Sequence, residues 1–387
     1  MKKLIGALAL AAMVATSAFA EVSFGAWVCN LPTLIASDGD GVKGGGVSNP
    51  WGWGARPARV DINFTSDDGK AGMILGAYAT FDGGLAGSSD NTLMWIKPIE
   101  QLRLSVGKFD NFFGTRSDLC FGSWNWLRPS PTGDGRWGEG ITFTAVTGVA
   151  GLGVEIMPIE ALKIFAFIPL EAPGAGSANV VKELKYVFGK GTYGAMYTID
   201  GIGKIKAQFI GKFNDEVGKK ETGTIEAAFD LTGIDKLNAT VGIDFNLKDS
   251  DTFKKGDKMF GATIGASYGI TEAFKLSADF SVSIPKEGDL GLGFGVGLDY
   301  AINDALGATA DVRMVMPQNG ADPSLSFLAG LTYACGSNAS LGLGFQAVMA
   351  MGDAAGQSKL KVVEAFKDGA EYKKFIFAVP LRFSTWF

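Results

Sequence analysis

The sequence predicts an all-β fold: a transmembrane, antiparallel, up-and-down β-barrel of about 18–20 strands (range roughly 16–20), preceded by a cleavable signal peptide. Three observations predict it. The chain opens on a secretion signal, long segments of alternating polar and apolar residues follow one another, and the last segment alternates up to a terminal aromatic residue.

Residues 1–20 are organised as a signal peptide. Two lysines come first, an apolar stretch follows from Leu4 to Thr16, and Ala18-Phe19-Ala20 is a small-x-small cleavage site. The apolar stretch is too short to span a membrane, and no later window offers about 18 uncharged apolar residues. We therefore expect a mature chain of residues 21–387 that forms a single barrel domain in an oxidising compartment.

The mature chain alternates with a period of two. In the segments 236–248, 273–285 and 305–315, apolar residues occupy one face and polar, often charged, residues the other. The segments run for about 9–13 residues, whereas soluble strands average about 5–6 and a tilted membrane crossing needs about 9–11. In a soluble sandwich the polar face meets bulk water, and in a membrane barrel it lines the lumen, so alternation alone does not separate the two. Strand length, strand number and the secretion signal favour the barrel, whose closure satisfies every backbone group in lipid.

About twenty segments qualify as strands, and a short turn motif recurs between them. Pro98–Leu102 resembles Pro158–Leu162, and three further turns near 233–237, 269–274 and 301–306 are similar. Counting strands from the termini puts the 158–162 turn at the opposite end of the barrel from the other four. Either the motif does not mark one end, or the strand count between 110 and 231 is wrong.

The last strand carries a resemblance. Its apolar residues include Phe383 and Phe387, with Thr385 as a departure from the apolar spacing. It resembles the terminal assembly signal of Gram-negative outer-membrane β-barrels. With the signal peptide and the long strands, the chain resembles an outer-membrane porin, and its glycine-rich, acidic, histidine-free character is most similar to the porin-like barrels of spirochaetes such as treponemes. The resemblance implies a place in the bacterial outer membrane, with membrane lipid and the barrel assembly machinery as partners. Porins are commonly trimers, so a homo-oligomer stays open.

Composition excludes several functions. The chain has no His and only 3 Cys, so a Ser-His-Asp triad, a His-ligated metal and an all-cysteine zinc or iron–sulfur site are ruled out. A net charge of −5 without a basic block argues against nucleic acid as a partner. We expect no enzymatic activity, no cofactor and no metal. Cys29 and Cys120 could form a disulfide that leaves Cys335 over, or all three thiols are free.

Charged residues recur on the polar faces of the expected strands. In a wet lumen such charges are tolerated and tune selectivity, whereas facing lipid each Arg or Lys near the midplane would cost about 2–4 kcal/mol. The alternative is the solvated face of a soluble sheet. The candidate lumen charges are Arg103, Lys206, Asp244, Asp279, Asp311 and Arg313.

Three long connections are expected, near 30–56, 110–137 and 351–372. In general porins a long loop after an early hairpin folds into the lumen and narrows it, and by resemblance we expect this of 110–137. Its aromatic and charged residues could also contact a sugar or a carboxylate, or they could pack among themselves or at the membrane interface. The candidate constriction residues are Arg116, Asp118, Trp124, Trp126, Arg128, Asp134, Arg136 and Trp137.

The leading functional prediction is a porin that passes small hydrophilic solutes by diffusion. A channel for hydrophobic solutes should instead show an apolar stripe in the lumen, and the Lys-rich and Asp-rich faces argue against it. The alternative from another class is a surface barrel with a closed lumen, an adhesin whose extracellular loops bind a partner.

Overall fold

The computed structural model describes most of residues 21–387 as strands and short turns. The described residues are 21–37, 39, 41–44, 46–48, 58–79, 85–109, 149–170, 188–214, 221–248, 257–316, 320, 322–352 and 374–386. The expected signal peptide, residues 1–20, lies outside them. Among the described residues no helix is long and apolar enough to cross a membrane.

All twenty described strands belong to one sheet in which every pairing is antiparallel. In chain order they are β1 (Glu21–Ser37), β2 (Val42–Lys43), β3 (Gly46–Ser48), β4 (Ala58–Thr65), β5 (Ala71–Ala79), β6 (Leu85–Ile99), β7 (Leu102–Phe109), β8 (Val149–Ile159), β9 (Leu162–Pro169), β10 (Thr192–Ile199), β11 (Gly203–Asn214), β12 (Glu221–Ile234), β13 (Leu237–Lys248), β14 (Lys258–Gly269), β15 (Phe274–Pro285), β16 (Gly291–Ala301), β17 (Leu306–Met316), β18 (Ser324–Ala334), β19 (Ala339–Ala350) and β20 (Phe375–Trp386).

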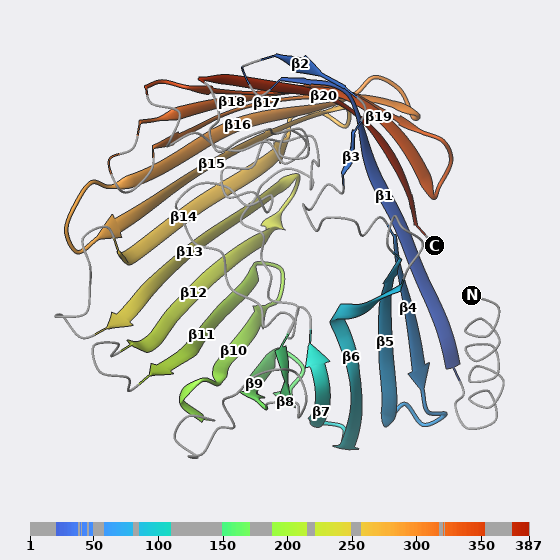
Figure 1. Ribbon diagram of the computed structural model, residues 1–387. Coiled ribbons are helices and arrows are strands. Elements are labelled where there is room, and N and C mark those ends of the chain that lie inside the picture. The colour runs from blue at the N-terminus through green and yellow to red at the C-terminus, as the bar shows by residue number, and fades with distance from the viewer. Residues whose placement is uncertain are drawn as a thin grey trace.

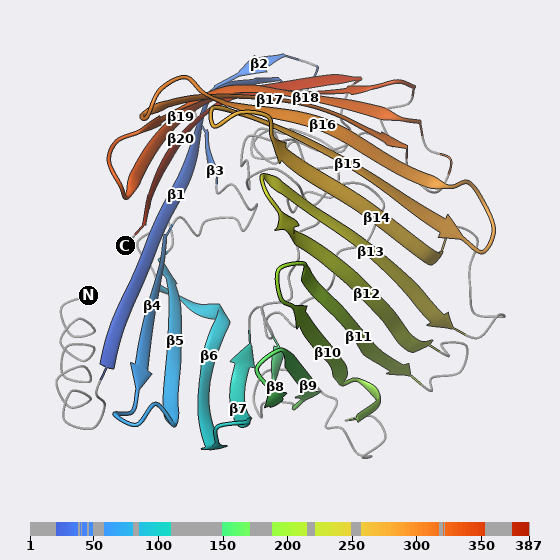
Figure 2. The same cartoon turned by 180° about the vertical axis from the view of Figure 1, so that it is seen from behind.

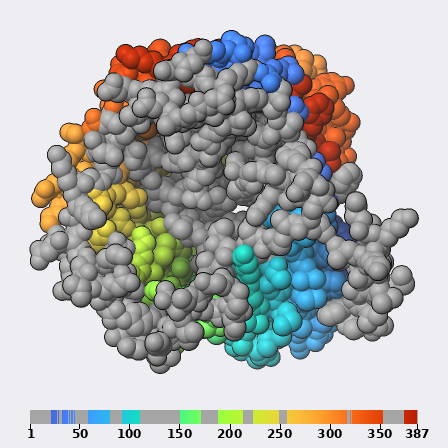
Figure 3. All heavy atoms as spheres, in the orientation of Figure 1, coloured from blue at the N-terminus to red at the C-terminus, as the bar shows by residue number. Residues whose placement is uncertain are grey.

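The sheet closes on itself. Each strand from β4 to β20 pairs with the next one along the chain, and β1 pairs with β4 on one edge and with β20 on the other. The described strands therefore make a ring of eighteen, and the two short segments β2 and β3 pair with the second half of β1. Figures 1 and 2 show the sheet curving around a central space, and in Figure 3 the strands follow one another around the outside in chain order. The expected up-and-down β-barrel is confirmed.

β1 is longer than the sequence predicts. A strand was expected near 22–29 and a long loop near 30–56, but β1 continues to Ser37. The reason is backbone pairing: β20 accompanies it as far as Ser37, while β4, β3 and β2 take turns on its other edge. The first long connection therefore begins only after Ser37.

The strand pairings show at which end of the barrel the turn at 158–162 lies relative to the four similar turns. β7 pairs directly with β8, and β9 pairs directly with β10. The segments expected as strands at 138–146 and 179–188 lie outside the described residues, except for Phe188. Without them all five turns fall at one end of the barrel, the end that also holds both termini of the ring. The ring of eighteen described strands agrees with the expected count of about 18–20, and among these strands the motif marks one end. By the convention of outer-membrane barrels, short turns are periplasmic and long connections extracellular.

The wall of the barrel is inverted relative to a soluble protein. Along β15 the polar residues Ser277, Asp279 and Ser281 are buried, while the apolar residues Leu276 and Phe280, at alternate positions of the same strand, are exposed. β14, β16 and β17 repeat this pattern. On β11 to β19, no described outward position holds Asp, Glu, Lys or Arg. A soluble sandwich would bury the apolar face, so this distribution favours a barrel surrounded by lipid.

Candidate functional site

The inward face of β14 to β16 is built from small residues. Glycines alternate along β16, and serines and threonines take the equivalent places on β14 and β15. Small inward residues leave the longer side chains of neighbouring strands free to lie across them. The set is Gly261, Thr263, Gly265, Ser267, Ser277, Ser281, Ser283, Gly291, Gly293, Gly295 and Gly297.

Arg313 uses this space to join two carboxylates on different strands. Its Nη1 donates to Asp279 of β15, and its Nε donates to Asp311 of β17 at 2.8 Å. The side chain crosses β16 above Gly295, where a Cβ atom would lie only 2.6 Å from Nη1. All three charged groups are nearly inaccessible, with residue exposures of 2% for Arg313, 2% for Asp311 and 9% for Asp279. Removing one member of such a buried set costs about 3–5 kcal/mol, because the others are left uncompensated.

A second polar network lies on β11 to β13. Lys206 forms an ion pair with Asp230, which also accepts a hydrogen bond of 2.9 Å from the Thr240 hydroxyl. Further along the same strands, Gln208 Nε2 donates to Glu226 at 2.7 Å. These contacts join side chains that the strand register places side by side on the inward face.

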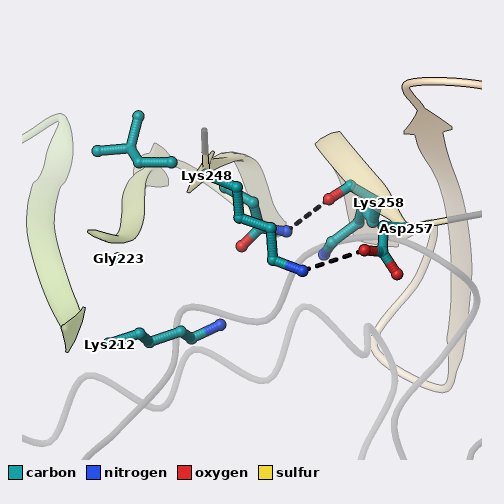
Figure 4. A pocket seen from close by; sticks show the side chains of 7 residues that line it. Lys212, Gly223, Lys248, Asp257 and Lys258 are labelled. Atoms are coloured by element: carbon teal, nitrogen blue, oxygen red, sulfur yellow. Dashed lines mark hydrogen bonds and ion pairs between the residues drawn. The ribbon is translucent and has the colours of Figure 1, made fainter. Parts of the chain in front are cut away.

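A polar pocket of about 220 Å³ lies where β11 to β14 meet the long-connection end (Figure 4). Lys248 forms an ion pair with Asp257 at 3.1 Å, and Lys258 with Asp244 at 2.5 Å. Lys212 is the third lysine that lines the pocket. Because carboxylates accompany two of the three lysines, the pocket is a mixed-charge surface and not a simple anion trap.

A third polar group lies near the short-turn end, on β6 to β9. The guanidinium of Arg103 lies 4.8 Å from the ring centre of Trp95, and its Nε is 3.7 Å from a carboxylate oxygen of Glu155. Lys163 donates to the other oxygen of Glu155 at 2.9 Å, and the Lys97 ammonium lies 5.6 Å from the Trp95 ring. Three cations thus surround one carboxylate and one indole.

The inward face of β5 to β10 also carries an apolar cluster that the sequence analysis did not predict. Leu93, Phe109, Phe165 and Phe167 pack together at 1–6% exposure, with Ile74, Trp95 and Met196 around them. The Phe109 and Phe167 rings meet edge to face, 5.2 Å apart. The sequence of β9 held a signal, because apart from Lys163 both faces of the strand are apolar, so most of its inward side is apolar too. The cluster is buried, and its side chains therefore do not offer the exposed apolar stripe of a hydrophobic-solute channel.

The candidate residues fall into two groups. All six candidate lumen charges, Arg103, Lys206, Asp244, Asp279, Asp311 and Arg313, lie at inward positions of described strands. All eight candidate constriction residues (Arg116, Asp118, Trp124, Trp126, Arg128, Asp134, Arg136 and Trp137) lie outside the described residues.

The terminal signal and the cysteines are only partly described. Phe383 faces outward at 47% exposure, and Phe387 lies outside the described residues. Cys335 is a free, exposed thiol in the β18–β19 turn. The side chains of Cys29 and Cys120 are not among those described, so a disulfide between them stays a prediction.

Comparison with known proteins gives a likeness in structure alone. No family model matches the chain, and no curated protein matches it. Among solved structures the chain is similar to an anion-selective porin from Comamonas acidovorans, with 12% identity, a TM-score of 0.55, and coverage of 95% of this chain and 99% of that one. It is also similar to a triple mutant of the Rhodopseudomonas blastica porin, with 14% identity, a TM-score of 0.51, and coverage of 94% and 100%. At these identities the likeness shows the fold, and the chain accordingly has the closed antiparallel β-barrel of the porin type.

Proposed function

We propose that the protein is a channel of the bacterial outer membrane through which small hydrophilic solutes diffuse passively. The observation that carries the proposal is the inverted wall of β11 to β19, with apolar residues outward and polar or charged residues inward, in a closed ring of eighteen strands. Barrels of about 16–18 strands are wide enough to leave an aqueous channel. The outward apolar face supports membrane lipid as the surrounding medium.

The structural neighbours agree with a passive role. Two of them are described as porins, one of them anion-selective, and none of their descriptions names an enzyme. The solute and selectivity of this chain do not follow from theirs. The finer similarity to spirochaete barrels rests on composition and belongs to the same proposal, as does assembly through the terminal strand with Phe383 and Phe387.

We further propose that the segment 110–137 narrows the lumen. The nearest described residues on either side support this: Phe109, the last residue of β7, belongs to the inward cluster, and β8 begins at Val149, the register partner of Phe109. The connection between β7 and β8 is therefore anchored at a residue of the inward cluster, as a constriction in the segment 110–137 requires. Its Arg, Asp and Trp residues would then set which solutes pass.

The first test is conductance. The mature chain, residues 21–387, is refolded, checked for heat-modifiable migration in gels, and reconstituted in a planar lipid bilayer. Stable ohmic current steps are the expected result, and a salt gradient then gives the ion preference from the reversal potential. Folded, inserted protein that never conducts would contradict the channel.

One observation favours a second candidate, a surface barrel with a closed lumen whose extracellular loops bind a partner. Several inward charges have 2–5% exposure, among them Lys206, Glu226 and Arg313, whereas charges along an open path are wetted. The conductance experiment separates the two, because a closed barrel would be silent although correctly inserted.

A further inference from the structure

We propose that Arg103 is the centre of an anion-recognition site on the inner wall, which takes a small solute bearing a carboxylate or phosphate group. The site lies on strands β6 to β11, close to the short-turn end. It deepens the proposed function, since it names a solute class for the channel. Three structural features support it in turn: local charge, the direction in which the guanidinium presents its N–H groups, and an unmet hydrogen bond.

The first step is charge. Five cations occupy inward positions near the short turns of β6, β7, β9 and β11: Lys97, Arg103, Lys163, Lys204 and Lys206. Among the described side chains of β6 to β11, Glu155 is the one inward carboxylate. Asp230 of the next strand pairs with Lys206. Although the whole chain is acidic, this sector of the wall is positively charged, and an anion near it gains attraction that bulk water does not fully screen.

The second step concerns the direction in which the Arg103 guanidinium presents its N–H groups. The Arg103 guanidinium lies 4.8 Å from the centre of the Trp95 ring, and Trp95 itself is held against Gly72, where a Cβ atom would lie 2.5 Å from the indole. A guanidinium stacked on an aromatic face keeps its N–H groups directed outward along its edge. That edge matches the two oxygens of a carboxylate or phosphate.

The third step is an unmet hydrogen bond. Among the described residues, Arg103 Nε is buried and has no hydrogen-bond partner: the nearer oxygen of Glu155 is 3.7 Å away, and the other oxygen of that carboxylate accepts from Lys163 at 2.9 Å. A buried charged donor left without an acceptor is costly. An oxyanion placed at the Arg103 edge would satisfy it, with Lys97 and Lys163 as neighbouring cations. Glu155 acts as a positioning residue, since it draws the two cations together from one side.

The binding test uses inorganic phosphate and refolded protein in detergent, so it does not require the barrel to conduct. Broadening of the phosphorus NMR line, titrated with phosphate, reports binding. We expect Arg103→Gln to weaken binding about tenfold, the equivalent of one charge-assisted hydrogen bond. Arg103→Lys should recover only part of it, because lysine keeps the charge and loses the fork. Lys236→Gln is the matched control: it makes the same charge change at the same end, in the β12–β13 turn outside the inner wall.

The conduction test uses the same variants. The wild-type channel should prefer chloride over potassium, and the preference should fall in Arg103→Gln and Lys204→Gln but not in Lys236→Gln. A barrel that is silent yet binds phosphate through Arg103 would contradict the channel and keep the site. Phosphate that does not bind, or binds equally to wild type and Arg103→Gln in heat-modifiable protein, would overturn the site whatever the barrel conducts.

Discussion

At the scale of single residues, glycine matters most where another side chain lies across it. Gly295 has no side chain, and for that reason Arg313 can reach from β17 to Asp279 on β15. The contact joins residues 34 positions apart, and it could not be predicted from the alternation, which says that Asp279 and Arg313 face inward but not that they meet. Meeting requires the register of three strands and an empty place on the middle one.

Gly295→Ala should therefore destabilise the barrel. The added methyl group would displace the Arg313 guanidinium from its two carboxylates, at a cost of about 1–3 kcal/mol. The free energy of unfolding is measured by urea titration of refolded protein in vesicles. Gly269→Ala is the control, because its Cβ atom would have only ordinary contacts, the nearest at 3.4 Å. Equal stability of the two variants would show that Arg313 moves aside without loss.

A second prediction at this scale concerns Asp68 in the exposed β4–β5 turn. The Ser66 hydroxyl donates to its carboxylate at 2.7 Å and the Lys70 backbone N–H at 3.0 Å, and these bonds hold the pKa of Asp68 below its ordinary value of 3.8. A lowered pKa means that the turn is favoured above that value and loses this contribution as the pH falls through the lowered pKa.

Ser66→Ala should raise the pKa of Asp68 toward 3.8, because the hydroxyl bond is the largest cause of the shift. Lys70→Ala should change it less, since the backbone N–H remains. Carboxyl chemical shifts followed by NMR against pH measure both. A pKa that does not respond to Ser66→Ala would contradict the hydrogen bond.

At the scale of elements, each strand has one face for lipid and one for the lumen. Val312 lies at the middle of β17 on the outward face, at 46% exposure, and Leu306 begins the same strand on the same face. Val312→Arg should cost about 2–4 kcal/mol of unfolding free energy, and Leu306→Arg about 0–1 kcal/mol, because the cost of a lipid-facing arginine falls from midplane to interface. Urea titration in vesicles measures both values. Small, equal costs would mean that this face does not lie in hydrocarbon.

The elements also show what alternation can and cannot predict. It identified β11 to β19 well, because one face of each is apolar and the other polar or small. It left the order of the strands between 110 and 231 open, because the pairings of β7 with β8 and of β9 with β10 join segments that lie far apart in the sequence. Alternation also missed the inward cluster on β6, β7 and β9. It needs a contrast between a polar and an apolar face, and an apolar residue alone does not show which face it occupies. The extra length of β1 depends on the partners β20, β3 and β2, which local sequence does not contain.

At the scale of the whole molecule, closure of the ring depends on the pairing of β1 with β20. Ala36 and Ala378 are partners in that register, and both are fully buried. Directly opposite residues of antiparallel strands have Cα atoms about 4.5–5.5 Å apart, within the range of disulfides.

The double variant Ala36→Cys/Ala378→Cys, with the three native cysteines replaced by serine, should form a disulfide that keeps the ring closed. Without reductant, heated protein should migrate faster in gels than the same protein heated with reductant. The single variant Ala36→Cys is the control and should show no difference. Failure to cross-link in folded protein would contradict the register between first and last strands.

Because β1 pairs with β20, the closed ring of described strands has no free edge strand. A chain that lacks β20 does not become a slightly smaller sheet. It exposes two rows of unpaired backbone N–H and C=O groups at once, on β1 and on β19, and exposed edges are templates for aggregation. The contact between the two ends of the mature chain is also the one with the longest loop to close, so its entropic cost is the largest in the ring. A truncated chain, or one whose last segment is not yet synthesised, is therefore an open sheet with two edge strands that can pair with other chains.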